Sequence, residues 1–558
     1  MKGYEAMADA LVAEGTEVIF GVLGGENDNL VHRLVEIGVR YVPVRHEQGA
    51  VGMADGYSRA TGRPGVATVT LGGALTNAAT PMTAARLSGS QVLVLVGDKR
   101  PGDGPEDRFG NQMIDQQPVL RATIGDFIEL ASEQRIDRDV QACFRKLRRG
   151  GGPIALNIPW PVLDASELPD DWKYTPAESV LPPEAKLSPD PAALATAVEW
   201  LTASERPLLV GGRGAAASDG AEAISALAAK CGALLATTLA AKGLFNGDPF
   251  SVGVSGGFAT HDGRRILEQA DLVVGFGAAL DNYTLDRGRL YDQAARVIRV
   301  DNDESRLDQF ADGSSLALLG DAKLTAEALS AAMNGGEAGW RSDDMRRQIS
   351  EIDAWRGVEF TAKSDCIDPR LVTKIANELL PADRQLVVDI GGFMAVPAMH
   401  MDISAAGDFV MPWRLGAMGQ GLPVAIGAAL GKPDQLTVLF IGDGGIMTTL
   451  TELDTAARSG VLLLVIVIDD GGYGAERYAC VISDRPSDLV DFDNPDYAGV
   501  ASAMGLDSYR VANPEELTEA LRTALPLART TLIQAIVDRD FYSAELFRTQ
   551  ANFRGREG

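Results

Sequence analysis

"GDGGIMTTLTELDTAARSGVLLLVIVIDDGG" spans residues 442–472 and carries an acid near each end. Asp443 follows the aliphatic run LTVLFI, a helical pattern comes next, and Asp470 follows a second aliphatic run. Continuous aliphatic runs, without alternation of polar residues, are typical of parallel strands that are buried on both faces. The stretch therefore predicts strand–helix–strand, with both acids at the carboxyl edge of a sheet, where α/β folds bind ligands.

The same alternation of aliphatic runs and helical patterns extends along all 558 residues. Such runs include EVIFGV, QVLVLVGD, ADLVVGFG and QLVVDIGG. Two segments rich in proline or acids, at 164–191 and 334–348, have the composition of linkers. We therefore predict an α/β protein with three doubly wound parallel-sheet domains, at 1–163, 190–335 and 365–545.

Two distant segments are weakly alike. Val66–Asp98 and Leu436–Asp470 both contain a strand pattern, a glycine turn, a threonine-rich helix that ends in AAR, and a second strand followed by an acid. This similarity predicts that the two outer domains share a fold.

Composition excludes several classes of function. The net charge of −26 is unsuited to a nucleic-acid partner, because phosphate backbones need clustered lysine and arginine. No apolar run is long enough to span a bilayer, and the first residues lack the apolar core of a signal peptide. We therefore expect no membrane association and a cytoplasmic location. The four cysteines form no C-x-x-C pair, which argues against a zinc site or a disulfide framework.

The two acids suggest a metal. A helix that begins after a glycine turn offers free N–H groups to a phosphate, but a carboxylate in that turn would repel the phosphate. A cation between them removes the conflict, and Mg²⁺ prefers one or two carboxylates together with phosphate oxygens. The alternative is that Asp443 and Asp470 only cap turns.

The whole unit resembles the signature of thiamine-diphosphate-dependent enzymes, which opens with GDG and closes with Asn-Asn. The resemblance implies that Asp443, Asp470 and the backbone carbonyl of Gly472 hold Mg²⁺ on the diphosphate. It also implies cofactor contacts at Gly442, Gly444 and Gly445. Asp469-Asp470 replaces Asn-Asn here, so an extra negative charge lies beside the diphosphate.

Three further segments carry the resemblance. In YVPVRHEQGAVGMADGYSRATGRPGV (41–66), Glu47 takes the position of the glutamate that binds the aminopyrimidine and shuttles its proton. WRLGAMGQGLPVAIGAALG (413–431) resembles the segment that supports the cofactor, with backbone contacts at Gly416 and Met418 and the Met418 side chain beneath it. VVDIGGFMAV (387–396) resembles the strand end that meets the diphosphate, at Gly391 and Gly392.

Two loops indicate the branch of the family. In FGVLGGENDNL (20–30), Gly25 stands where simple pyruvate-type decarboxylases carry aspartate, as in acetolactate synthases. In FGNQMIDQQPVLRATI (109–124), Gln112 matches a glutamine of acetolactate synthases and benzaldehyde lyases, and the decarboxylase histidine pair is absent. Asn111 replaces the usual aromatic residue. The resemblance is therefore to the acetolactate synthase and benzaldehyde lyase-like branch, with Glu47, Gln112 and Gly25 as candidate catalytic residues.

The central domain lacks one feature of acetolactate synthases. These enzymes bind FAD through an arginine after a strand, but VVGFGAALDNY (273–283) has Ala278 and Ala279 there, so we do not expect FAD. Because Glu47 and Asp443 lie in different domains, the resemblance implies a homodimer or homotetramer with active sites at the subunit interface.

The predicted function is that of a thiamine-diphosphate- and Mg²⁺-dependent carboligase or acyloin lyase acting on 2-oxo acids or 2-hydroxy ketones. A site poor in acid–base groups favours ligation or reversible C–C cleavage. Two alternatives remain open: a 2-oxo acid decarboxylase, and an inactive paralogue that serves as a structural or regulatory subunit. A nicotinamide dehydrogenase is disfavoured because no G-x-G-x-x-G follows a strand with a later acid.

Overall fold

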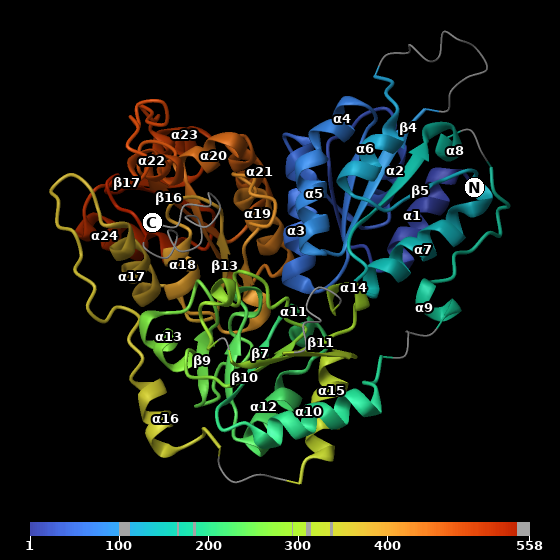
Figure 1. Ribbon diagram of the computed structural model, residues 1–558. Coiled ribbons are helices and arrows are strands. Elements are labelled where there is room, and N and C mark those ends of the chain that lie inside the picture. The colour runs from blue at the N-terminus through green and yellow to red at the C-terminus, as the bar shows by residue number, and fades with distance from the viewer. Residues whose placement is uncertain are drawn as a thin grey trace.

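Three six-stranded parallel sheets, each covered by helices, make up the computed structural model (Figure 1). The structure describes residues 1–99, 112–164, 167–181, 186–292, 294–307, 314–334 and 339–543. The sheets lie within the predicted ranges 1–163, 190–335 and 365–545, whose boundaries stay predictions. The predicted α/β class with three doubly wound parallel sheets is confirmed.

The first sheet has the strand order β2-β1-β3-β4-β6-β5. Its strands are β1 (Val18–Gly21), β2 (Arg40–Pro43), β3 (Gly65–Val69), β4 (Val92–Asp98), β5 (Phe127–Glu129) and β6 (Ile154–Pro159). Its helices are α1 (Gly3–Ala13), α2 (Asp28–Glu36), α3 (Glu47–Thr61), α4 (Gly73–Asn77), α5 (Ala79–Ser88), α6 (Gln116–Thr123), α7 (Ile136–Arg148) and α8 (Trp160–Asp164). Aliphatic side chains on both faces of these strands are buried.

The second sheet has the order β12-β11-β10-β7-β8-β9, which is the doubly wound arrangement of dinucleotide-binding folds. Its strands are β7 (Pro207–Gly211), β8 (Leu234–Thr237), β9 (Ser251–Val254), β10 (Leu272–Phe276), β11 (Arg296–Asp301) and β12 (Ser315–Leu319). Its helices are α10 (Pro191–Ala203), α11 (Arg213–Ala217), α12 (Ala221–Cys231), α13 (His261–Leu267), α14 (Glu304–Leu307) and α15 (Ala322–Ala332), followed by α16 (Asp343–Ser350).

The third sheet has the order β14-β13-β15-β16-β18-β17. Its strands are β13 (Arg384–Val388), β14 (Phe409–Val410), β15 (Leu436–Gly442), β16 (Leu463–Asp469), β17 (Asp507–Val511) and β18 (Thr531–Ile536). Its helices are α17 (Pro369–Leu379), α18 (Ala395–His400), α19 (Gly421–Gly431), α20 (Asp443–Thr449), α21 (Glu452–Ser459), α22 (Gly474–Val481), α23 (Tyr497–Ala503) and α24 (Pro514–Ala524). Taken in chain order, its strands are arranged as in the first sheet, so the predicted common fold of the outer domains is confirmed.

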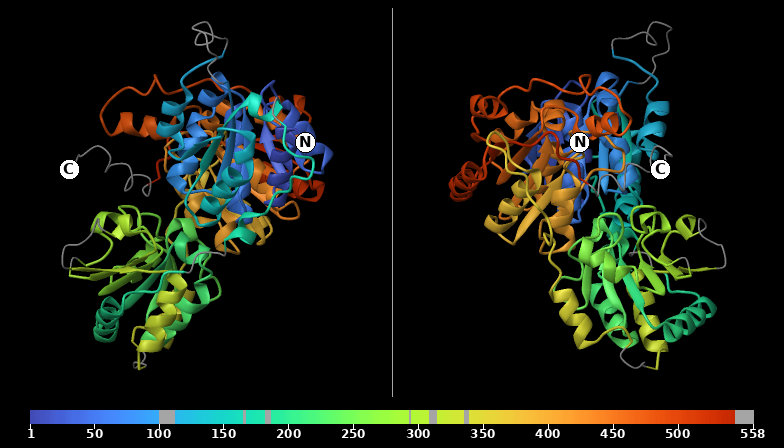
Figure 2. Two further views of the ribbon diagram at one scale, coloured as in Figure 1. Left: turned by 90° about the vertical axis from the view of Figure 1, so that its right-hand side faces the viewer. Right: turned by 60° about the vertical axis from the view of Figure 1, so that its left-hand side comes forward.

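Residues 167–181 of the first linker follow the surface of the first domain (Figure 2). They contain the short helix α9 (Ala177–Val180). The buried carboxylate of Glu14 accepts hydrogen bonds from the Tyr174 hydroxyl, at 2.5 Å, and from the backbone N–H of Ala177, at 2.6 Å. This linker is therefore anchored to the domain that precedes it. Within the described residues, no helix combines the length and apolar character that crossing a bilayer requires.

Helices α3 and α19 join the first and third domains and lie side by side between the two sheets (Figure 1). The contact is between backbones: a Cβ at Gly56 would lie 1.9 Å from the Val424 carbonyl oxygen, and one at Gly427 would lie 1.9 Å from the Met53 carbonyl oxygen. Only glycine allows this approach, so these two positions fix how the outer domains meet.

The variant Gly56→Ala tests this contact. The added methyl group must push the two helices apart, because a backbone oxygen cannot rotate away, and we expect a loss of about 1–3 kcal/mol of stability. The measurement is the midpoint of thermal unfolding. Gly73→Ala is the control, because no atom lies within 4 Å of its added Cβ. Equal midpoints for the two variants would contradict the close contact.

Candidate active site

The carboxyl edge of the third sheet brings the predicted diphosphate residues together. Strands β13, β15 and β16 are neighbours, and Gly442 pairs with Ile468, so the turns that follow these strands meet. The turns contain the predicted cofactor and metal residues Gly391, Gly392, Gly442, Asp443, Gly444, Gly445, Asp470 and Gly472. The sequence prediction that the two acids share one sheet edge is therefore correct.

Asp443 is the first residue of α20 and is buried. Its Oδ2 accepts hydrogen bonds from the backbone N–H of Gly472, at 2.9 Å, and from Asn494 Nδ2, at 2.5 Å. Its Oδ1 accepts from the backbone N–H of Gly444 at 2.7 Å. The Gly472 contact links the turn after β15 to the turn after β16.

Asn494 joins two carboxylates, a role that the sequence patterns do not identify. Its Nδ2 donates to Asp443 Oδ2 and also to Asp469 Oδ1, at 2.7 Å. Gln534 Nε2 donates to Asp469 Oδ2 at 2.7 Å, from the neighbouring strand β18. Amide donors therefore surround Asp469, the first of the two acids that replace Asn-Asn. In the sequence, Asn494 lies within DFDNPDY (491–497), and nothing in this loop distinguishes it from the neighbouring acids.

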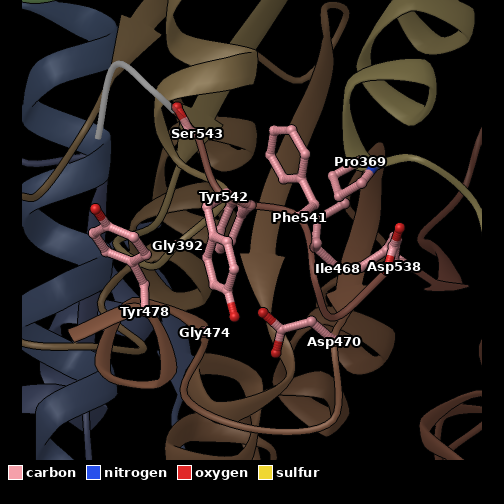
Figure 3. Close-up of a pocket in the computed structure, with 12 residues that line it drawn as sticks. Pro369, Gly392, Ile468, Asp470, Gly474, Tyr478, Asp538, Phe541, Tyr542 and Ser543 are labelled. Atoms are coloured by element: carbon pink, nitrogen blue, oxygen red, sulfur yellow. The ribbon is translucent and has the colours of Figure 1, made fainter. Parts of the chain in front are cut away.

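Asp470 borders a small cavity of about 20 Å³ whose other walls include Gly392, Tyr478 and Tyr542 (Figure 3). This volume suits about one water-sized ligand. Asp470 Oδ1 is buried and has no hydrogen-bond partner in the described structure. The nearest cation is the buried guanidinium of Arg477, whose Nη1 lies 3.6 Å away and whose Nε binds Asp491. The extra charge of Asp470 is thus partly balanced by Arg477.

Asp443 and Asp470 have raised pKa values. Burial and the nearby Asp469 carboxylate raise the pKa of Asp443 above the usual aspartate range. Burial and the Asp443 carboxylate raise the pKa of Asp470 in the same direction, against the attraction of Arg477. Both shifts arise because burial and like charge disfavour the ionised form. A bound cation would reverse this preference.

These residues fit a divalent cation. Asp470 Oδ1 is an oxygen acceptor that receives no hydrogen bond, and Asp470 lines a cavity of suitable size. A Cβ at Gly474 would lie 2.1 Å from Asp470 Oδ2, so glycine keeps this space open. The described residues contain no group of three or more His, Cys, Asp or Glu side chains arranged to hold a metal. The predicted Mg²⁺ ligands are not a group of this kind, because only Asp443 and Asp470 are acidic side chains and the third ligand is the backbone carbonyl of Gly472.

The loop that carries Gly416 and Met418 joins β14 to α19. Gly416 has a φ of 75°, and the Met418 side chain is 37% exposed. Asp389, directly after β13, holds the loop by accepting hydrogen bonds from the backbone N–H groups of Gly419, at 2.8 Å, and Gly421, at 3.1 Å. Burial raises the pKa of Asp389 to about 7. Asp389 is a second site residue that the sequence patterns do not identify.

Glu47 begins α3 at the carboxyl edge of the first sheet. Its Oε2 accepts a hydrogen bond from Asn77 Nδ2 at 2.9 Å, a contact within its own domain. The adjacent His46 caps the helix, because its Nδ1 accepts from the backbone N–H of Gln48 at 3.1 Å. This neighbouring ring nitrogen is therefore engaged in a structural role.

Gly25 and Gln112 belong to the same edge of the first sheet. Gly25 is exposed in the loop after β1. Gln112 is exposed with a φ of 67°, and its carbonyl oxygen lies against Gly72, in the turn after β3. The structure therefore brings the loops of Gly25, Glu47 and Gln112 to one edge. Asn111 lies outside the described residues.

In the central domain, the loop after β10 contains Ala278 and Ala279, where an arginine would mark an FAD site. The side chain of Arg299, from the neighbouring strand β11, binds this loop. Its guanidinium donates to the carbonyl oxygens of Ala279, at 2.8 Å, and Leu280, at 3.0 Å. These two hydrogen bonds hold the Arg299 guanidinium against the backbone of the loop. That FAD is not bound stays a prediction.

Comparison with known families covers all three domains. Residues 1–119 match "Thiamine pyrophosphate enzyme, N-terminal TPP binding domain", residues 194–329 match the central domain of the same family, and residues 389–535 match its C-terminal TPP binding domain. The chain belongs to the thiamine pyrophosphate enzyme family. The sequence resemblance is confirmed, and each of the three matched ranges falls on a different one of the three sheets.

Curated relatives place this enzyme in the acetolactate synthase branch. The chain is 27% identical over 542 residues to "Acetolactate synthase isozyme 2 large subunit" of Escherichia coli, covering 96% of each chain. It is 30% identical over 539 residues to "Probable 2-ketoarginine decarboxylase AruI" of Pseudomonas aeruginosa, covering 95% of this chain and 93% of the relative. A solved thiamine diphosphate-dependent 4-hydroxybenzoylformate decarboxylase of Rhodococcus jostii is similar in fold, with a TM-score of 0.80 at 22% identity over 96% of this chain and 99% of that one.

The raised pKa values predict pH-dependent binding of Mg²⁺. Protons occupy the free carboxyl groups as the pH falls, and the cation must displace them, so affinity decreases toward low pH. In the presence of thiamine diphosphate we expect at least about a tenfold loss between about pH 8 and about pH 6, measured by calorimetric titration.

Asp470→Asn removes one of the two competing protons and should flatten this dependence. Asp493→Asn, at an exposed acid without a resolved contact to the pair, is the control and should keep the wild-type slope. An affinity of the wild type that does not change with pH would contradict the proposed role of the two acids.

Proposed function

We propose that this thiamine-diphosphate-dependent enzyme uses Mg²⁺ and forms or cleaves C–C bonds of 2-oxo acids or 2-hydroxy ketones, in the manner of an acetolactate-synthase-like carboligase or an acyloin lyase. The observation that carries the proposal is the composition of the first sheet's carboxyl edge. Glu47 is accompanied there by Gly25 and Gln112, neither of which can transfer a proton. Of the four histidines, only His46 adjoins Glu47, and its Nδ1 caps α3.

In this proposal Asp443, Asp470 and the Gly472 carbonyl hold Mg²⁺ and through it the diphosphate. Bound thiamine diphosphate supplies a carbon nucleophile and an electron sink. The turns after β13 and β15 offer the backbone of Gly391, Gly392, Gly442, Gly444 and Gly445 to the phosphates. Gly416 and Met418 support the pyrimidine, and Glu47 exchanges a proton with it. Because neither Gly25 nor Gln112 can deliver a proton beside Glu47, we expect a new C–C bond to be favoured over protonation of the product.

The runner-up function is decarboxylation of a 2-oxo acid, which is favoured by the 30% identity to a probable 2-ketoarginine decarboxylase. With pyruvate, thiamine diphosphate and Mg²⁺, we expect acetolactate or acetoin as the main product, measured by chromatography. Acetaldehyde as the main product would favour the decarboxylase. Absence of any product, together with absence of C2 proton exchange in the bound cofactor, would favour the inactive paralogue.

We also propose a homodimer or homotetramer whose active sites combine Glu47 of one copy with Asp443 of another. The partner of Glu47, Asn77, belongs to its own domain, and Asp443 lies in the third domain. A small-molecule substrate enters between the copies. A cytoplasmic location, without nucleic-acid or membrane partners, is part of the same proposal.

Complementation tests the shared site. Glu47→Gln and Asp443→Asn subunits, each inactive alone, are co-expressed with different tags, and the mixed assembly is purified through both tags. One site per mixed dimer then retains both residues, so we expect about half of wild-type activity. Activity no higher than that of the single variants would contradict a site shared between copies.

A further inference from the structure

A buried carboxylate of the third domain contacts the segment that leads into Glu47. Glu452, the first residue of α21, has a side chain that is only 1% exposed. Its Oε1 accepts hydrogen bonds from the backbone N–H groups of Arg45, at 3.2 Å, and His46, at 3.0 Å. These are the two residues directly before Glu47.

Three observations fix this carboxylate in place. The Thr455 hydroxyl donates to Glu452 Oε2 at 2.6 Å, one turn along the same helix. A Cβ at Gly49 would lie 2.3 Å from Glu452 Oε1, so only glycine in the first turn of α3 leaves room for the carboxylate. His46 is the N-cap of α3, so its backbone N–H has no partner within the helix and needs an acceptor from outside.

The surrounding contacts connect the same two segments. Arg45 Nε donates to Asp454 Oδ2 at 2.6 Å, and Arg458 Nη2 donates to the Pro43 carbonyl oxygen at 2.8 Å. These side chains are partly exposed, and exposed ion pairs contribute little. Glu452 is the one of these anchors that is buried and bound to the backbone, so it determines where the loop between β2 and α3 ends.

We infer that Glu452 is a positioning residue, which holds the backbone of Arg45 and His46 so that the Glu47 carboxyl group meets the cofactor in the geometry that proton exchange requires. The inference rests on the proposed role of Glu47. Glu452 acts through the acceptor capacity of its Oε1 and does not touch substrate or cofactor. Small displacements of a reacting group reduce rates strongly, so loss of this acceptor slows proton exchange while leaving the distant metal turns intact.

Two variants of equal length separate the acceptor from the packing. Glu452→Gln can keep an oxygen toward the two backbone N–H groups and its amide toward Thr455, whereas Glu452→Met fills the space without an acceptor. The measurement is the rate of hydrogen–deuterium exchange at C2 of bound thiamine diphosphate, followed by NMR on the full-length holoenzyme. Cofactor affinity and the midpoint of thermal unfolding are measured on the same samples.

We expect Glu452→Met to lower the exchange rate about tenfold or more, with cofactor affinity within about threefold of wild type, and Glu452→Gln to stay near the wild-type rate. Asp454→Asn is the matched control on the same helix, because it removes the charge that pairs with the Arg45 side chain and leaves the backbone contacts of Glu452, and its exchange rate should be unchanged. If Glu452→Met does not fold, Thr455→Val replaces it, since loss of the hydroxyl frees the carboxylate and should lower the rate about threefold.

Equal exchange rates in Glu452→Met and wild type would overturn the inference, as would equal losses in the Met and Gln variants. A loss of exchange matched by an equal loss of cofactor affinity would overturn it too, since Glu452 would then serve stability alone. Glu47→Gln separates the two levels of the proposal. If it exchanges as fast as wild type, the proposed role of Glu47 fails; if it is slow and Glu452→Met is fast, only the role of Glu452 fails.

Discussion

The burial of like charges at one sheet edge is the constraint on which this active site depends. Asp443, Asp469 and Asp470 follow neighbouring strands, and buried carboxylates are costly without donors or counter-ions. The fold surrounds them with backbone N–H groups, the amides of Asn494 and Gln534, and Arg477. One acceptor, Asp470 Oδ1, remains without a hydrogen bond. A cation bound there would supply the missing partner, so under the proposed function loading of the cofactor and its metal would stabilise this edge.

The same unit also reaches the other end of the site. The chain between Asp443 and Asp470 forms α20, α21 and β16, and α21 carries Glu452 to the loop before Glu47. A single supersecondary element therefore carries Asp443 and Asp470 near its two ends and also binds the backbone of Arg45 and His46, the two residues before Glu47. The close backbone packing of α3 on α19 also holds the two domains in place around the Glu452 contact, because neither helix can slide without a clash at Gly56 or Gly427.

Patterns that are local in the chain could be predicted from sequence, and those that depend on tertiary partners could not. The aliphatic runs of β3, β4, β15 and β16 indicated parallel strands correctly, since such strands are buried on both faces. Strand β6 lies inside the first sheet yet gave no such run, because the buried Asn157 interrupts it and is satisfied by Gln116 and Asp98. Edge strands such as β2 are half exposed and carry a weaker pattern. Likewise, Asn494, Asp389 and Glu452 became visible only with the partners that their side chains bind.

The two outer sheets share one strand order, yet their edges carry different chemistry. Under the proposed function, the first edge would supply the Glu47 carboxyl group for proton exchange, and the third would supply Asp443, Asp470 and the Gly472 carbonyl for the metal. Because the strands of both domains form the same scaffold, the turns at each edge can differ without changing the fold. The loops of one outer domain can therefore change, and with them the substrate preference, while the turns of the other outer domain stay the same.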